Sequence, residues 1–147
     1  MIISELRVYD FRQFKSVDDA PGLKITFHKG LNALIGENDS GKTAVIDALK
    51  LVLLTQSNEY IRPSDEDFYK PVGEDACSEF KIDCTISDFT QNEAKNFIEY
   101  LSFNQTENGI EYTLELHYRA WKEGHKIYQE LPMNTAFVSI AYVIQDK

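Results

Sequence analysis

Residues 36–43 read G-E-N-D-S-G-K-T: two glycines separated by four residues, followed directly by a lysine and a threonine. Gly36 and Gly41 let the backbone turn sharply and come close to a ligand, because glycine has no Cβ atom. Such a turn aims successive backbone N–H groups into one concavity that fits a phosphate. A helix that begins there adds the positive end of its dipole at the same point. This spacing therefore predicts a site for the phosphates of a nucleotide.

The side chains of this loop have separate expected roles toward ATP and Mg²⁺. Lys42 supplies a mobile cation for the β- and γ-phosphates, and Thr43 supplies a hydroxyl for Mg²⁺. The predicted nucleotide-binding residues of the loop are Gly36, Asn38, Asp39, Ser40, Gly41, Lys42 and Thr43. The alternative is a glycine-rich turn at the start of a helix that holds no ligand. A strand before the loop and a helix after it would argue against that alternative.

The sequence on both sides of the loop matches the context that this motif requires. Before it, the short apolar run at 31–35 predicts a buried strand. After it, residues 44–54 have helical length and are mostly good helix formers. Apolar residues cover most of the circumference of this helix, so we expect other elements to cover it on more than one side.

Much of the remaining chain alternates apolar and polar residues with the two-residue period of a half-buried strand. Strands are predicted over 2–9, 23–28, 78–86, 110–118 and 125–131, with a last strand or buried segment over 137–144. Thr90 and Glu93 form a capping box that opens a helix reaching Leu101. Residues 55–75 and 104–109 are predicted to be loops. We therefore expect a single domain over 1–147 of mixed α/β class.

Charge and hydropathy exclude several classes of function. The chain of 147 residues carries 15 basic and 24 acidic residues, a net charge of −9. Surfaces that bind nucleic acid are usually basic, so this chain is not expected to grip DNA or RNA itself. It has no apolar run of membrane-spanning length and no signal peptide at its start, which predicts a cytoplasmic location without membrane contact.

Two further groups of residues could hold a metal, and the sequence favours neither. Cys77 and Cys84 lack the spacing of a zinc site and are expected to stay reduced, with Cys84 packed inside. The acidic run at 65–67 is more typical of solvated surface than of a metal site. The metal expected in this chain is therefore the Mg²⁺ at Thr43.

A P-loop ATPase needs a second acidic element, an apolar strand that ends in aspartate, to hold Mg²⁺ and organise water. Asp83 follows a segment that is too polar and too short, and Asp146 follows Gln145 where an apolar residue belongs. The chain also has no Leu-Ser-Gly-Gly signature stretch. We therefore predict the phosphate site without a catalytic residue.

Three stretches of the chain resemble one group of ATPases. Residues 2–14, with a Phe-Arg-Gln-Phe turn at 11–14, resemble the start of RecF-, SMC- and OLD-type (overcoming lysogenization defect) ATPases. Residues 30–43 resemble the strand and P-loop of the same group. The Asp-Glu-Asp-Phe loop at 65–68 looks most like the OLD family of ATP-dependent nucleases. The resemblance covers about the first half of the chain and is topological after that.

The resemblance implies the N-terminal lobe of an ABC-type ATPase head, with a mixed or antiparallel sheet around the P-loop helix. In this group two heads enclose two ATP molecules, which implies a homo-oligomer. Arg12 would lie near the nucleotide phosphates, or would otherwise be a surface arginine at a strand end. In OLD proteins a Toprim nuclease domain follows the ATPase. The chain thus resembles one lobe of a longer protein that contacts DNA through other regions.

Two other classes of function stay open. A transporter ATPase subunit would have an adenine-stacking aromatic near Phe11, although the turn at 11–14 argues against this class. A non-enzymatic SMC-like module would bind ATP to control assembly. As a lobe of an ABC-type head, the chain is expected to self-associate through the apolar helix after the P-loop or through the terminal run at 137–144.

Overall fold

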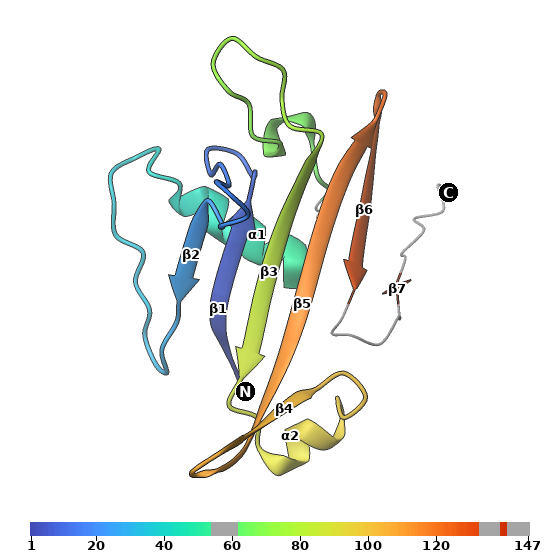
Figure 1. The fold of residues 1–147 in the computed structure, drawn as a ribbon. Coiled ribbons are helices and arrows are strands. Elements are labelled where there is room, and N and C mark those ends of the chain that lie inside the picture. Colours follow the sequence, from blue (N-terminus) through green and yellow to red (C-terminus); the bar gives the residue numbers. More distant parts are fainter. Residues whose placement is uncertain (54–61, 133–138, 141–147) are drawn as a thin grey trace.

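The computed structural model describes residues 1–53, 62–132 and 139–140 (Figure 1). The strands are β1 Ile2–Tyr9, β2 Leu23–Thr26, β3 Glu79–Ser87, β4 Ser102–Thr106, β5 Gly109–Glu123, β6 Lys126–Pro132 and β7 Ser139–Ile140. The helices are α1 Lys42–Leu53, α2 Gln91–Lys95 and the short 3-10 helix η1 Asp65–Asp67. In these described ranges, no helix has the length and apolar character needed to cross a membrane.

The strands pair antiparallel in the order β2-β1-β3-β5-β6-β7, and β4 pairs with the start of β5 (Figure 1). The register aligns the apolar residues that alternate along the central strands, because Leu6 pairs with Cys84 and Cys84 with Leu116. One face of the sheet is therefore apolar. The opposite face carries charged contacts between strands, such as that of Arg7 with Asp83.

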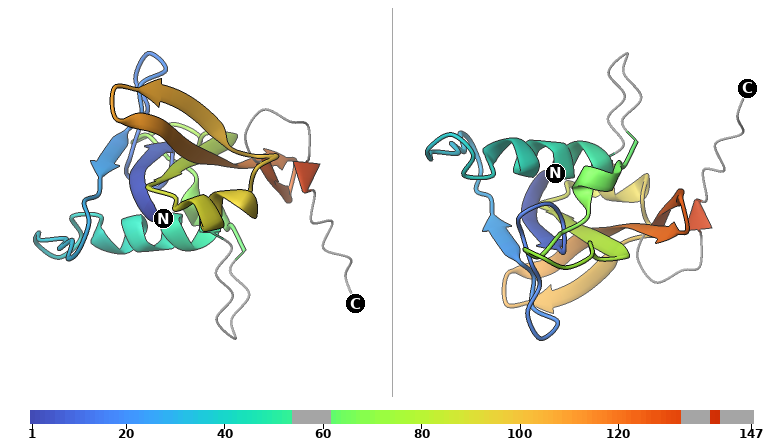
Figure 2. Two further views of the ribbon diagram at one scale, coloured as in Figure 1. Left: turned by 90° about the horizontal axis from the view of Figure 1, so that it is seen from below. Right: turned by 90° about the horizontal axis from the view of Figure 1, so that it is seen from above.

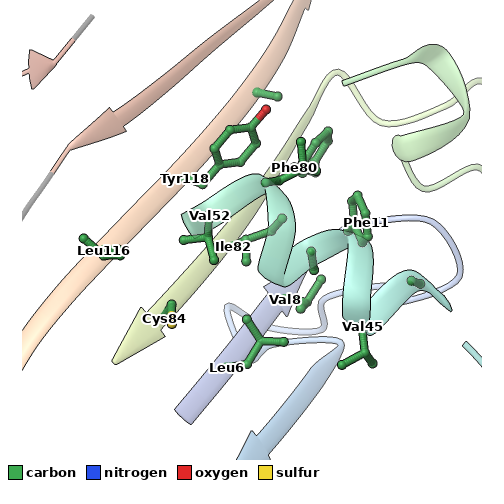
Figure 3. Close-up of a cluster of buried hydrophobic side chains, with 14 of the residues drawn as sticks. Leu6, Val8, Phe11, Val45, Val52, Phe80, Ile82, Cys84, Leu116 and Tyr118 are labelled. Carbon is green, nitrogen blue, oxygen red and sulfur yellow. The ribbon is translucent and has the colours of Figure 1, made fainter. Parts of the chain in front are cut away.

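Helix α1 lies against the apolar face of the sheet (Figure 2). Its buried residues are Ala44, Val45, Ala48, Leu51 and Val52. Figure 3 labels two of them, Val45 and Val52, together with buried side chains of β1, β3 and β5. The largest fully buried side chains of the chain include Leu6, Val8, Phe11, Phe80, Ile82, Cys84 and Tyr118. Burial of each large apolar side chain contributes about 1.5–3 kcal/mol. This contact therefore holds α1 in its position on the sheet.

The centre of this core is an aromatic cluster around Phe80 on β3. The Phe80 ring centroid lies 5.0 Å from that of Phe11, 5.0 Å from that of Phe68 and 5.9 Å from that of Tyr118. Phe11 belongs to the turn after β1, and Phe68 follows η1. The cluster therefore fixes two loop segments, distant in sequence, on the same part of the sheet.

The structure confirms most of the predicted elements. The predicted capping box is formed, with Thr90 Oγ1 accepting from Glu93 N and Glu93 Oε2 accepting from Thr90 N. Cys84 is buried, as predicted. The helix after Thr90 is shorter than predicted, since α2 ends at Lys95 and turns continue to residue 100, yet Leu101 is still buried. The predicted run at 137–144 lies outside the described residues, apart from β7.

The predicted strand at 31–35 is wrong, because these residues form no strand. Leu31 is 95% and Ile35 94% exposed. The described part of the sheet has no strand beside this segment to receive its backbone hydrogen bonds. The Asn32 side chain instead bonds to the backbone of His28 across the turn at Gly30, which directs the chain away from the β2 edge.

One other prediction is corrected by the structure. Residues 104–109 are not a loop, because β4 pairs with β5 up to the match of Thr106 with Gly109, which leaves a two-residue turn. Helix α1 buries five residues among the described part of the chain and leaves Ile46 44% exposed, so the expected cover on more than one side stays a prediction.

Candidate nucleotide-binding site

The P-loop lies against the turn that follows β1. Asp39 and Gly41 have φ angles of 65° and 95°, in the left-handed region that glycine adopts most readily. A Cβ atom on Gly41 would lie 2.5 Å from Gln13 Nε2 and 2.6 Å from Phe14 Cζ. Both the backbone angle and the close approach of the turn therefore require glycine at position 41.

The first residues of the P-loop contact Lys42, near the end of the same loop. A Cβ atom on Gly36 would lie 2.5 Å from Ser40 Oγ, so the two ends of the loop are in close contact. Ser40 N donates to Glu37 O over 3.3 Å. The Lys42 ammonium donates to the carbonyl oxygens of Gly36 and Glu37. The loop thus curls around the Lys42 side chain and holds a positive charge at the start of α1.

A cavity of about 480 Å³ opens between the P-loop and the turn after β1. Its lining residues are Arg12, Gln13, Asn38, Asp39, Gly41, Lys42, Thr43 and Ala44. The cavity thus brings together most of the predicted loop residues with Arg12, while Gly36 and Ser40 pack against each other. Because α1 begins at Lys42, the unpaired N–H groups and positive dipole end of this helix lie at the same cavity.

Two other cavities of the described part have different chemistry. One of about 400 Å³, between α2 and the β4–β5 hairpin, is lined mainly by apolar side chains that include Ile98 and Phe103. Another of about 320 Å³, on the far side of the sheet, has Asp10, Glu79 and Asp83 in its lining. The apolar cavity offers a triphosphate few donors, and the acidic one would repel it.

Arg12 is held at the edge of the P-loop cavity by two carboxylates. Its Nε donates to Asp67 Oδ1 over 2.9 Å, and its Nη1 donates to Asp47 Oδ2 over 2.8 Å. Arg12 itself has a φ of 51°, and its guanidinium lies 5.1 Å from the Phe11 ring centroid. Burial lowers the pKa of Arg12, but the hydrogen bonds to Asp47 and Asp67 outweigh it, so its pKa lies above the ordinary value. The side chain therefore stays charged.

The predicted solvated surface at 65–67 is partly wrong. Asp65 fits the prediction, because its side chain is 85% exposed even though it forms an ion pair with Lys122. Asp67 is only 5% exposed and binds Arg12. The turn of η1 leaves Asp65 and Glu66 exposed to solvent and directs Asp67 toward the protein. In the part of the chain that the structure describes, no group of three or more potential metal ligands is found.

Sequence reasoning missed three residues at this site: Gln13, Asp47 and Asp67. Asp47 follows Thr43 by four residues, so the shared helix face was visible in the sequence. The contact of Arg12 with Asp67 joins residues 55 positions apart, and no periodicity in the sequence indicates it.

The two cysteines have no role at this cavity. Cys77 and Cys84 are free thiols. Burial raises the pKa of the Cys84 thiol to about 11, so it stays protonated and unreactive at neutral pH.

Comparisons with known proteins agree with the predicted group of ATPases. The sequence profile of the AAA ATPase domain family matches residues 1–138. The DNA replication and repair protein RecF of Streptococcus suis (strain 05ZYH33) is 36% identical over 58 residues, 40% of this chain and 14% of RecF. The DNA double-strand break repair Rad50 ATPase of Pyrococcus abyssi is 32% identical over 73 residues, 50% of this chain and 8% of Rad50. The matches thus span a small part of each relative's length.

A solved structure agrees with the fold. It comes from work on the ATP-driven dimerization and DNA-stimulated activation of SMC ATPases, and it matches 90% of this chain and 69% of its own chain with a TM-score of 0.60. At 19% identity this likeness concerns the fold alone. The predicted fold class, a P-loop ATPase lobe with an antiparallel sheet around the P-loop helix, is confirmed. Since the family profile matches residues 1–138 of 147, the chain belongs to the AAA ATPase domain family.

Proposed function

We propose that this chain binds ATP with Mg²⁺ at the P-loop cavity. The observation that carries the proposal is the convergence of Lys42, Thr43 and Arg12 on one cavity at the start of α1. Lys42 and the helix N-terminus would bind the β- and γ-phosphates, and the Thr43 hydroxyl would bind Mg²⁺. Backbone N–H groups from Asn38 to Thr43 would cradle the phosphates between them.

The wider role that we propose is an ATP-controlled step in DNA processing. The relatives are named for DNA replication and repair, double-strand break repair and chromosome partition. The net charge of −9 supports DNA contacts through regions outside this chain rather than through it. The acidic turn at 65–68 supports the finer proposal of a cytoplasmic OLD-type ATP-dependent endonuclease. An ABC transporter subunit is disfavoured because Phe11, fully buried at 0% exposure, offers no ring face to an adenine.

The test is nucleotide binding by the lysine variant. Lys42→Ala removes the mobile cation of the loop, and we expect ATP affinity to fall at least tenfold, about 1.4 kcal/mol or more. Isothermal titration calorimetry with ATP and Mg²⁺ measures it. Lys24→Ala is the matched control, because Lys24 is a surface lysine on β2 that contacts Glu5. Equal ATP affinities for wild type and Lys42→Ala would contradict the proposal.

We also propose that the chain self-associates through the exposed apolar segment 31–35. Leu31 and Ile35 are 95% and 94% exposed, far more than Ile46 on α1 at 44%. Burial of two such side chains would contribute about 1.5–3 kcal/mol each. The SMC ATPase with the similar fold is described with ATP-driven dimerization. These observations favour segment 31–35 over α1 as the contact face.

We expect wild type to self-associate at micromolar concentration. The double variant Leu31→Ser/Ile35→Ser should need a protein concentration at least about tenfold higher to associate to the same extent. Analytical ultracentrifugation with and without ATP measures this. Val72→Ser is the control, since Val72 is equally exposed, at 103%, but lies outside the segment. A wild-type monomer that binds no hydrophobic dye would refute the proposal.

A further inference from the structure

The Arg12 guanidinium is bound by carboxylates at two of its three nitrogens. Its Nε and Nη1 groups donate to Asp67 and Asp47 at 2.9 and 2.8 Å. No described residue accepts a hydrogen bond from its Nη2 group, while Arg12 lines the P-loop cavity together with Lys42 and Thr43. Nε and Nη1 point to opposite sides of the planar guanidinium, so the two carboxylates bind different sides of it and leave the two N–H groups of Nη2 for a further anion.

Asp67 is the more deeply fixed of the two carboxylates. It is 5% exposed, and its second oxygen, Oδ2, accepts from Ser64 N over 2.9 Å. Its main chain also contributes, because Arg12 N donates to Asp67 O over 2.8 Å. The neighbouring residues Phe11 and Phe68 form an isolated antiparallel β-bridge, which joins the turn after β1 to the segment after η1. Asp67 therefore holds both the backbone and the side chain of Arg12.

The charges around Arg12 balance. Asp47 and Asp67 contribute two negative charges, and Lys50 lies 3.8 Å from the other oxygen of Asp47. With Arg12 and Lys50 both positive, the cluster is neutral. An approaching phosphate therefore meets an oriented hydrogen-bond donor rather than a region of excess negative charge. The neutral cluster therefore keeps the Arg12 side chain oriented at the cavity.

We propose that Asp67 is a positioning residue that, with Asp47, orients the Arg12 guanidinium so that its Nη2 group binds the terminal phosphate of a nucleoside triphosphate. The inference rests on the proposed function and adds a basis for distinguishing ATP from ADP. Lys42 and the loop N–H groups bind phosphates that both nucleotides share. Arg12 lies on the opposite wall of the cavity and adds a contact with the terminal phosphate, which ADP lacks. The position of Arg12 depends on a carboxylate that does not itself touch the nucleotide.

The test compares ATP and ADP affinities of Asp67→Asn by calorimetry with Mg²⁺. Asparagine keeps the size of the side chain but loses the charge that orients Arg12. We expect ATP affinity to fall on the order of tenfold and ADP affinity to stay within about twofold. Asp65→Asn is the matched control, because it removes the same charge from the same turn at a side chain that is 85% exposed. It is expected to change neither affinity.

A double variant separates positioning from a general structural role. In an Arg12→Ala background, Asp67→Asn should cause no further loss of ATP affinity, since the residue it orients is gone. An additive loss, an equal loss for ATP and ADP, or no loss of ATP affinity would each overturn the inference. Retained ADP binding serves as the check that the variant is folded. Failure of the proposed function would look different, because Lys42→Ala would then leave binding of both nucleotides unchanged.

Discussion

Phe80→Ala is expected to lower the free energy of unfolding by about 3–5 kcal/mol, the usual range for removing a buried phenylalanine. Phe80 is 1% exposed and contacts the rings of Phe11, Phe68 and Tyr118. Its removal leaves a cavity that three rings on different segments border. These segments are already held by strand pairing and by the Arg12–Asp67 contact, so they cannot collapse fully into the space.

Urea unfolding followed by circular dichroism measures this loss. Val72→Ala is the control, because Val72 is 103% exposed and its truncation should change stability by no more than about 0.5 kcal/mol. The denaturant slope should be the same for both variants, since the native state buries similar surface in each. A loss below about 1 kcal/mol for Phe80→Ala would mean that the aromatic cluster is not the centre of the core.

The cluster also connects stability to the nucleotide site. Phe11 directly precedes Arg12, and Phe68 directly follows Asp67. Phe80 contacts both phenylalanines at 5.0 Å. The position of Arg12 at the cavity therefore depends on a hydrophobic contact as well as on its two carboxylates.

The sequence was sufficient to predict elements whose signal is local. Strand alternation identified β1, β3 and β5, because each of these strands has buried residues at alternate positions, which give the sequence its two-residue period. The capping box at Thr90 depends on residues three positions apart, and it is formed. The P-loop and the start of α1 are likewise set by adjacent residues, with Gly41 at a φ of 95°.

Features that depend on distant partners could not be predicted in this way. The run at 31–35 has the composition of a buried strand, yet a strand also needs a neighbour to accept its hydrogen bonds. Asp67 has the composition of a surface residue, and its burial follows from pairing with Arg12 across 55 positions. The β4 strand was hidden because its residues are largely polar and exposed, so it lacks the apolar alternation of the core strands.

This chain is expected to bind ATP without steady hydrolysis. Among the described lining residues of the cavity, Thr43 is the candidate metal ligand and Asp39 is the one carboxylate. The two nearby acids, Asp47 and Asp67, are both bound to Arg12. Asp39 is therefore the one described carboxylate of the cavity lining, and it belongs to the phosphate loop itself rather than to an apolar strand that ends in aspartate.

The sequence shows neither the apolar strand that ends in aspartate nor the signature stretch of these ATPases. Since loss of one group that stabilises the charge of phosphoryl transfer can lower the rate by about 10³–10⁵, we expect turnover near background. Phosphate release under multiple-turnover conditions measures it, with Lys42→Ala as the reference that reports contaminating ATPases. Wild type and Lys42→Ala should release phosphate at the same low rate, although they differ at least tenfold in ATP affinity. Steady turnover by wild type that Lys42→Ala abolishes would contradict the prediction. It would place a catalytic carboxylate within this chain, and Asp39 would be the first residue to replace, because it already lines the cavity.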